Sequence, residues 1–313
     1  MGEIWAVTAY FNPLRYATRL ANYRMFRERL RVPLLAVELG FDGQFDLDNT
    51  AADVVIRRTG RDVLWHKERL LNEAIAALPP RCDRVVWLDA DVIFVDDGWA
   101  ERLAEALDHH CLVQPFARFH HLGKDEPFPP LTEGRPPDGW SLVHLLRTVA
   151  LPEDHWRQGG KSKVHHYQPG FAWAAWRADV EAVGLYDALI LGSGDRAFLS
   201  AACGRQEDFV IKLGMNARQA DHYLSWAGPV AALFAGDVSS LDGDVVHLWH
   251  GDIRDRGYCA RYEELAAHDF DPHVDIAREE GGSWRWVSDK PRLHAFVARY
   301  FRDRREGIRL DAT

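Results

Sequence analysis

Two acidic residues, one residue apart, interrupt the most apolar part of the chain. The stretch is VVWLDADVIF (residues 85–94), in which Asp89 and Asp91 follow a run of apolar residues. Two like charges in such a place repel each other and need a compensating cation. A divalent metal with hard oxygen ligands suits that role and would also bind a diphosphate. The alternative interpretation is a pair of solvated loop acids, one of which caps a turn or a helix.

Two later segments carry residues that could complete such a site. HLWHGD places His247 and His250 at the end of a late apolar run, and imidazole can join carboxylates around a metal. LGSGDRAF places Asp195 directly after Gly194, where a helix is expected to begin. Asp195 is therefore either the N-cap of that helix or a general base for an acceptor hydroxyl.

Apolar runs alternate with helical patterns over the first hundred residues, and this alternation predicts an α/β fold. The expected strands are 4–7, 33–39, 53–58, 84–88, 170–176 and one that starts at 244. The expected helices are 16–30, 64–78, which Pro79 and Pro80 end, and one that begins near 194. The unbroken apolar character of 84–88 is typical of a strand buried on both faces of a mostly parallel sheet. Ligands of such sheets bind beyond the carboxyl ends of the strands, where Asp89 and Asp91 lie.

The composition narrows the class of protein. The 313 residues are 47% hydrophobic and 27% charged, as in an ordinary globular protein. The net charge of −9 argues against general nucleic-acid binding, which needs a basic face. The four cysteines are scattered, which argues against a zinc site and against a disulfide framework. We find no signal-peptide pattern and no apolar run of the roughly 18 residues that a membrane span needs, so we expect a cytoplasmic location without a transmembrane segment.

Taken in order, these features resemble the GT-A fold nucleotide-sugar glycosyltransferases. The resemblance covers residues 4–258 and is strongest at 66–94, which contains the D-x-D, and at 169–198, which is similar to the galactosyltransferase-like branch. It implies a Rossmann-like single domain with a central, mostly parallel sheet flanked by helices. The implied divisions are a catalytic domain 1–260, made of a nucleotide-sugar half 1–115, an irregular loop insertion 116–168 and an acceptor half 169–260, followed by a helical C-terminal extension 261–313.

The resemblance also implies roles for the candidate residues. Asp91 would bind a Mn²⁺ or Mg²⁺ ion directly, whereas Asp89 would contact ribose or the metal indirectly. His250 would be the late metal ligand, because a basic stretch follows it as in the family, and His247 is the fallback. Asp195 would deprotonate the acceptor hydroxyl.

Further residues are implied to bind the nucleotide sugar. Thr8, Tyr10 and Asn12, after the first strand, would line the base and the ribose. On the helix before the D-x-D, Lys67, Arg69 and Asn72 would face the nucleotide or its phosphates. The alternative for these last three is an exposed helix face with ordinary polar contacts. Gly194 would let the backbone approach the ligand closely.

The expected activity is the transfer of a sugar from a nucleotide diphosphate sugar, with a UDP-sugar favoured, to a saccharide or another hydroxyl acceptor. An acid at Asp195 favours inversion, but the second acid that the galactosyltransferase-like branch usually carries is absent beside it, where Gly194 and Arg196 stand. Acceptor type and stereochemical outcome therefore stay open. The insertion histidines, which are His120, His121, His165 and His166, could line an acceptor pocket, although loop histidines are more often structural.

Two other functions remain open. DADV also fits the D-x-D-x-V motif of haloacid-dehalogenase-type phosphatases, in which Asp89 would be phosphorylated. In that fold the motif normally lies on the first strand, whereas here some 80 residues precede it. A nucleotide-sugar-binding module that has lost catalysis is the third possibility.

Overall fold

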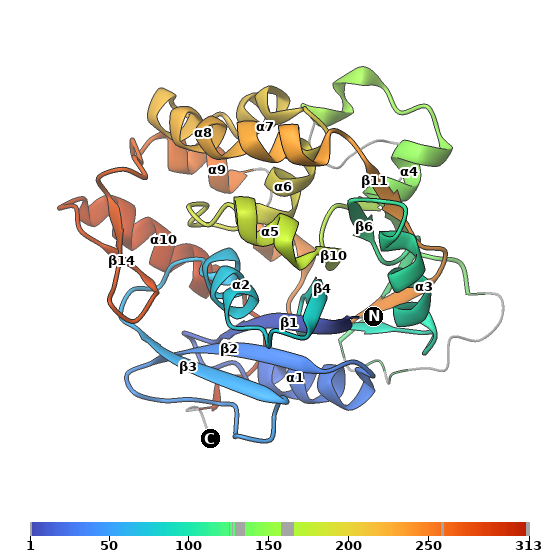
Figure 1. Ribbon diagram of the computed structural model, residues 1–313. Coiled ribbons are helices and arrows are strands. Elements are labelled where there is room, and N and C mark those ends of the chain that lie inside the picture. The colour runs from blue at the N-terminus through green and yellow to red at the C-terminus, as the bar shows by residue number, and fades with distance from the viewer. Residues whose placement is uncertain are drawn as a thin grey trace.

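The computed structural model describes residues 2–124, 126, 128, 135–157, 166–257 and 260–310, and a sheet with helices on both faces forms its centre (Figure 1). The sheet has seven strands in the spatial order β11-β6-β10-β4-β1-β2-β3. Their bounds are β1 (Glu3–Phe11), β2 (Leu34–Phe41), β3 (Val54–Gly60), β4 (Cys82–Leu88), β6 (Leu112–Gln114), β10 (Ala172–Trp176) and β11 (Val238–Ser240). β1 to β4 run parallel to one another, whereas β10 is antiparallel to β4 and to β6. The predicted α/β fold with a central, mostly parallel sheet is confirmed.

The apolar run before the acidic pair forms the buried middle of this sheet. Residues 85–88 are all 3% exposed or less, because helices cover both faces of β4. The strand ends at Leu88, so Asp89 and Asp91 leave the sheet at its carboxyl edge. This is the edge at which α/β sheets bind ligands.

The helices divide between the two faces, and each group has its own apolar core. One core contains Tyr23 and Phe26 of α1 (Ala17–Arg29) and Leu103 of α3 (Trp99–Leu107). The helices of the other core are α2 (Lys67–Ala76), α4 (Leu142–Thr148), α5 (Arg177–Val183), α6 (Gly194–Ala202), α7 (Gln206–Leu213), α8 (Ala217–Phe234), α9 (Ala260–Ala266) and α10 (Pro291–Asp303). In Figure 1, α1 lies below the sheet and α2 above it. The expected helices at 16–30 and 64–78 correspond to α1 and α2 and are confirmed.

A second sheet joins the acidic segment to the late histidine segment. Its spatial order is β5-β12-β7-β8-β9. The bounds are β5 (Val92–Phe94), β7 (Arg118–His121), β8 (Gly139–Ser141), β9 (Tyr167–Gln168) and β12 (Asp244–His247). The described part of 116–168 therefore contains three strands of this sheet, together with α4 and the 3₁₀ helix η1 (Glu153–Trp156). This segment is more regular than its Pro, Gly and His content indicates, because it extends a sheet rather than forming one long loop.

Residues 260–310 pack on the body of the protein. They contain α9 (Ala260–Ala266), a hairpin of β13 (Ile276–Arg278) and β14 (Trp284–Trp286), and α10; a 3₁₀ helix, η2 (Ile253–Arg256), precedes them. Apolar side chains of α10, among them Phe296 and Phe301, belong to the same core cluster as Phe11 of β1 and Leu71 of α2. The C-terminal part is thus packed against β1 and α2 and includes a hairpin as well as the predicted helices.

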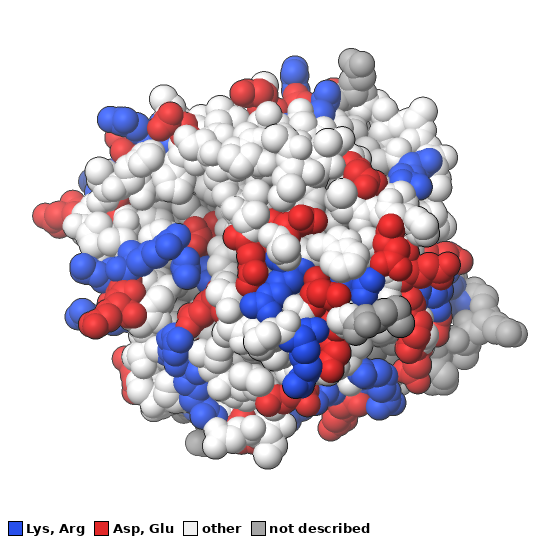
Figure 2. Space-filling model, in the orientation of Figure 1, with Lys and Arg blue, Asp and Glu red and all other residues white. Residues whose placement is uncertain are grey.

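The surface shows acidic and basic side chains mixed across the face seen in Figure 2, rather than gathered by sign. Over the described ranges, no helix combines the length and the apolar character that a membrane crossing would require.

We expect Trp173 to be a major contributor to stability. It lies on β10 opposite Trp87, is fully buried, and its indole N–H donates to the carbonyl of Pro169 over 2.9 Å. Trp173→Ala should lower the free energy of unfolding by about 3–5 kcal/mol, because it leaves a cavity and an unpaired carbonyl. Urea unfolding followed by circular dichroism measures this, with the exposed Ile211→Ala as the control that should change stability by less than about 0.5 kcal/mol. Equal effects of the two substitutions would contradict the assignment.

Candidate functional site

Pairing between β5 and β12 brings the acidic pair and the late histidines together. Val92 lies opposite His247 in the antiparallel register, and the backbone N–H of Leu248 donates to the carbonyl of Asp91 over 2.9 Å. Asp91 directly precedes β5 and His247 ends β12, so both side chains lie at the same edge. His250 follows in the loop after β12. Two segments far apart in the sequence therefore meet through backbone hydrogen bonds.

Asp91, His247 and His250 form a compact group whose ligand atoms all lie within 4.8 Å of one another. The Nε2 atoms of the two imidazoles are 3.0 Å apart. Asp91 Oδ2 lies 3.3 Å from His250 Nε2, and Asp91 Oδ1 lies 3.8 Å from His247 Nε2. Neighbouring ligands of an octahedral ion with bonds of about 2.1 Å are about 3.0 Å apart. The three side chains are thus spaced as ligands of one divalent cation.

The electrostatics of this group also fit a cation. Burial, followed by the charge of Asp89, raises the pKa of Asp91 to about 7. Burial lowers the pKa of His250 to about 3 and holds that of His247 well below its usual value, so both imidazoles are neutral. Asp91 Oδ1 is buried and has no hydrogen-bond partner among the described residues. An unpaired buried carboxylate oxygen costs free energy, which a bound cation would recover.

Lys67 holds the other acid of the pair. It is the first residue of α2, and its Nζ lies 2.5 Å from Asp89 Oδ1 and 2.8 Å from Asp195 Oδ2. Burial alone would lower the pKa of Lys67, but Asp195 and Asp89 hold it well above the usual value. The ammonium therefore stays charged and links the end of β4 to the start of α6. Asp89 faces this ammonium and is not part of the group around Asp91, so its role at a metal stays a prediction.

A strained turn presents Asp195 at the start of α6. Ser193 has a φ of 79°, in the left-handed region that non-glycine residues rarely adopt, and Arg261 Nη2 donates to its hydroxyl over 2.7 Å. Gly194 follows, and a Cβ added there would come within 2.1 Å of Glu68 Oε1. Glycine is therefore required at 194 by close packing. Burial raises the pKa of Asp195, and the neighbouring Lys67 opposes that rise.

Glu68 is a buried acid that sequence reasoning missed. It is 5% exposed, and its Oε2 accepts a hydrogen bond from the indole N–H of Trp65 over 3.0 Å. Burial raises the pKa of Glu68 to about 8, although Lys67 opposes the shift. α2 thus places a buried acid next to the turn that carries Asp195. Its place next to Gly194 results from packing between distant segments, for which the sequence offers no local signal.

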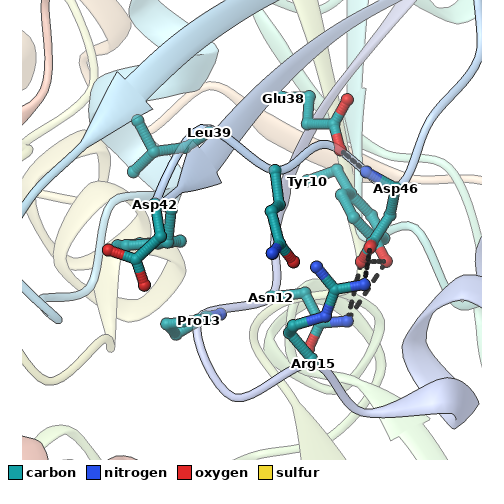
Figure 3. Close-up of a pocket in the computed structure, with 10 residues that line it drawn as sticks. Tyr10, Asn12, Pro13, Arg15, Glu38, Leu39, Asp42 and Asp46 are labelled. Carbon is teal, nitrogen blue, oxygen red and sulfur yellow. Dashed lines mark hydrogen bonds and ion pairs between the residues drawn. The ribbon is translucent and has the colours of Figure 1, made fainter. Parts of the chain in front are cut away.

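A polar pocket of about 120 Å³ opens at the ends of β1 and β2 (Figure 3). Tyr10 and Asn12 line it, and the Tyr10 hydroxyl and Asn12 Nδ2 both donate to Asp46 Oδ2 over 2.9 Å. Glu38 lies across the pocket and accepts from the backbone N–H of Asp46. Thr8 is fully buried in the sheet instead, where its hydroxyl donates to the carbonyl of Leu88 over 2.8 Å. Two of the three residues predicted to line a nucleotide pocket therefore share one cavity.

A second and larger pocket, of about 490 Å³, opens beside the group around Asp91. Its walls include His247, His250, Trp249 and Arg254. This volume is within the range of small-molecule sites. His121 also lines it, and its Nδ1 lies 3.1 Å from His247 Nδ1.

The remaining residues of α2 that were predicted to face the nucleotide make contacts within the protein. Arg69 Nη1 lies 3.1 Å from Asp187 Oδ2. Asn72 exchanges two hydrogen bonds with the backbone of Leu185, over 2.7 and 2.8 Å. These contacts fasten α2 to the segment that precedes α6. The predicted contacts of Arg69 and Asn72 with a nucleotide stay predictions.

The insertion histidines have different surroundings. His120 is buried and its Nε2 lies 2.9 Å from Asp244, as expected for a structural side chain. His121 reaches the larger pocket. His166 is exposed, and His165 lies outside the described residues.

Comparison with known proteins gives similarity in structure only. No protein-family model matches the chain, and no curated protein sequence matches it. Among solved structures, it is similar to glucosyl-3-phosphoglycerate synthase from Mycobacterium tuberculosis in complex with Mg²⁺ and UDP, with a TM-score of 0.41 and 13% identity over 91% of this chain and 87% of that one. It is also similar to S. aureus TarS, with a TM-score of 0.38 and 11% identity over 87% of this chain and 41% of that one.

A third similar structure is 4-diphosphocytidyl-2C-methyl-D-erythritol synthase from Anaerococcus prevotii, with a TM-score of 0.37 and 12% identity over 77% of this chain and 87% of that one. Identities of 11–13% and TM-scores of 0.37–0.41 assign no function to this chain.

The raised pKa of Glu68 predicts a pH-dependent stability. The folded state keeps its proton up to about pH 8, whereas the unfolded chain releases it near 4.5, so stability falls as the pH rises between these values. Glu68→Gln cannot ionise and should remove this part of the decline. The free energy of unfolding of Glu68→Gln, relative to that of the wild type, should therefore increase by up to about 1.4 kcal/mol for each pH unit between the two pKa values. Urea unfolding at pH 5, 6.5 and 8 measures the difference, and parallel curves for the two proteins would contradict it.

Proposed function

We propose that this protein is a metal-dependent glycosyltransferase that moves a sugar from a nucleotide diphosphate sugar to a hydroxyl acceptor. The observation that carries the proposal is the group of Asp91, His247 and His250, spaced for one cation and containing a buried carboxylate oxygen without a hydrogen-bond partner among the described residues. The group lies at the carboxyl edge of an α/β sheet, where the resemblance to GT-A glycosyltransferases places the donor.

Asp91, His247 and His250 would hold a divalent ion, and the two nitrogen ligands favour Mn²⁺ over Mg²⁺, which prefers oxygen. The ion would neutralise the negative charge that develops on the leaving diphosphate. The larger pocket beside these residues has room for a diphosphate and a sugar. Arg254 on its wall pairs with Asp252 over 3.1 Å and would exchange this partner for phosphate oxygens.

The base of the nucleotide would occupy the polar pocket at the ends of β1 and β2, because about 120 Å³ has room for a base but not for a whole nucleoside. Asp46 there is held by the Tyr10 hydroxyl and Asn12 Nδ2, so its carboxylate is fixed in position. A fixed carboxylate is a suitable acceptor for ribose hydroxyls or for a base N–H. We favour a UDP-sugar as the donor.

Asp195 would act as the base toward the acceptor. Its burial raises the affinity of the carboxylate for a proton, which suits proton uptake from a hydroxyl in the transition state. Lys67 keeps this carboxylate oriented and opposes the rise in its pKa that burial causes. A base on the acceptor side favours inversion at the anomeric carbon.

Binding of the donor should depend on metal. In a thermal-shift panel of nucleotides and nucleotide sugars, one diphosphate sugar should raise the melting temperature of the protein, because a ligand that binds the native state stabilises it. The increase should be larger in Mn²⁺ than in EDTA. The absence of any metal-dependent shift across the panel would overturn the proposal. Binding without turnover on a range of acceptors would instead favour a non-catalytic module, and a phosphorylated Asp89 after incubation with phosphate esters would favour a phosphatase.

Single substitutions should separate metal binding from catalysis. Asp91→Asn should abolish the Mn²⁺-dependent shift, because it removes the charged ligand. Asp195→Asn should keep that shift but lower kcat by about 10²–10⁴, because an amide cannot accept the proton. Asp237→Asn, at an acid that pairs with His110 outside both pockets, is the matched control and should keep wild-type transfer. Full transfer activity in both site variants would contradict the assignment.

A further inference from the structure

The last residues of the chain return to the site. The carbonyl of Ile308 accepts from the backbone N–H of Ala17, and the N–H of Leu310 donates to the carbonyl of Arg15. These bonds, over 2.9 and 2.7 Å, fasten residues 304–310, here named the C-terminal segment, to the start of α1. The segment also packs against the loop that carries His250, since a Cβ on Gly251 would come within 2.7 Å of the carbonyl of residue 304.

Glu306 is the buried charge of this segment. It is 2% exposed, and its two oxygens accept from Arg19 Nε over 2.5 Å and Nη2 over 3.0 Å. Arg304 Nε donates to Glu306 Oε1 over 2.6 Å. Burial would raise the pKa of Glu306, but the two guanidinium groups hold it well below the usual value. Glu306 is therefore a carboxylate that can only accept hydrogen bonds.

The imidazole of His250 lies between this carboxylate and the predicted metal position. Its Nδ1 is 3.7 Å from Glu306 Oε1, which is longer than a hydrogen bond, and its Nε2 is 3.3 Å from Asp91 Oδ2. Nδ1 is buried, has no hydrogen-bond partner among the described residues, and has the Glu306 carboxylate as its facing charge. The two ring nitrogens thus face two different acids. A neutral imidazole has one N–H, so the group that faces each nitrogen decides which of them is free to bind a metal.

We propose that Glu306 is a positioning residue for the metal site: its carboxylate keeps the proton of His250 on Nδ1 and so directs the Nε2 lone pair toward the position between Asp91 and His247. This inference rests on the proposed function, because it assumes a metal at that position. Metal-binding histidines commonly have a carboxylate at their second nitrogen, which fixes the tautomer and the ring orientation.

The same tautomer fixes the order of protons along the neighbouring imidazoles. In the metal-free protein, with its proton on Nδ1, His250 Nε2 is the acceptor in the 3.0 Å contact with His247 Nε2, which must then be the donor and must give up this proton before it can bind a metal. His247 Nδ1 becomes the acceptor in the 3.1 Å contact with His121 Nδ1. Each of these two contacts between imidazoles then has one donor and one acceptor. Glu306 therefore fixes the direction of hydrogen bonding through three histidines of the site.

The decisive measurement is Mn²⁺ affinity, titrated by electron paramagnetic resonance on the full chain without nucleotide. Glu306→Gln should bind Mn²⁺ about 10–100-fold more weakly than the wild type, because it loses the charge that holds the Nδ1 proton. Asp208→Asn is the matched control. Asp208 is also a buried carboxylate held by two arginines, Arg157 Nε at 2.6 Å and Arg205 Nε at 2.8 Å, but it lies on α7. Both variants should lose stability, and Glu306→Gln alone should lose affinity.

A second readout needs no substitution of Glu306. Side-chain ¹⁵N spectra of the metal-free wild type should show His250 protonated on Nδ1, with its signals identified by their loss in His250→Asn. Protonation on Nε2 would overturn the inference, as would wild-type Mn²⁺ affinity in a destabilised Glu306→Gln. If the wild type itself binds no Mn²⁺, the metal site of the proposed function fails as well. If the wild type binds Mn²⁺ and Glu306→Gln binds it equally, the role of Glu306 alone is wrong.

Discussion

The buried ammonium of Lys67 is the interaction on which the candidate site depends. It lies 2.5 Å from Asp89 and 2.8 Å from Asp195, which come from the end of β4 and the start of α6. Two carboxylates could not be held together in a protein interior without a cation between them, because both repulsion and desolvation oppose it. The ammonium therefore joins the acidic edge of the sheet to the turn at Gly194, and the predicted donor and acceptor sides of the site meet there.

The two acids of the D-x-D face different partners, so the repulsion between the two carboxylates is offset in different ways. Asp89 pairs with Lys67, whereas Asp91 turns toward His247 and His250. One carboxylate is thus compensated by the protein itself, and the other is left for a cation from solution.

Local sequence patterns predict one part of this arrangement. The apolar run before Asp89 predicts a central strand that ends at the ligand-binding edge, and a late apolar run predicts His250 at the end of another strand. Glu68 and Glu306 carry no such pattern. Glu68 lies beside Gly194 because α2 packs on the turn before α6, and Glu306 lies near His250 because the chain end folds back over α1. Contacts of this kind depend on tertiary packing, which neither periodicity nor spacing encodes.

The C-terminal segment brings Glu306 close to His250 when it packs on α1. Asp91 and His247 are aligned by β5 and β12, but the surroundings of His250 include Glu306, which is close to the end of the described chain. The arginines that hold Glu306 come from α1 and from the segment itself, so the C-terminal segment must dock before the second nitrogen of His250 meets its carboxylate. A cation that binds Asp91 and His250 would favour that docked state over any state in which the segment is released, because binding to one conformation stabilises it. If Glu306 has the proposed role, metal binding and docking of residues 304–310 on α1 would be one coupled equilibrium.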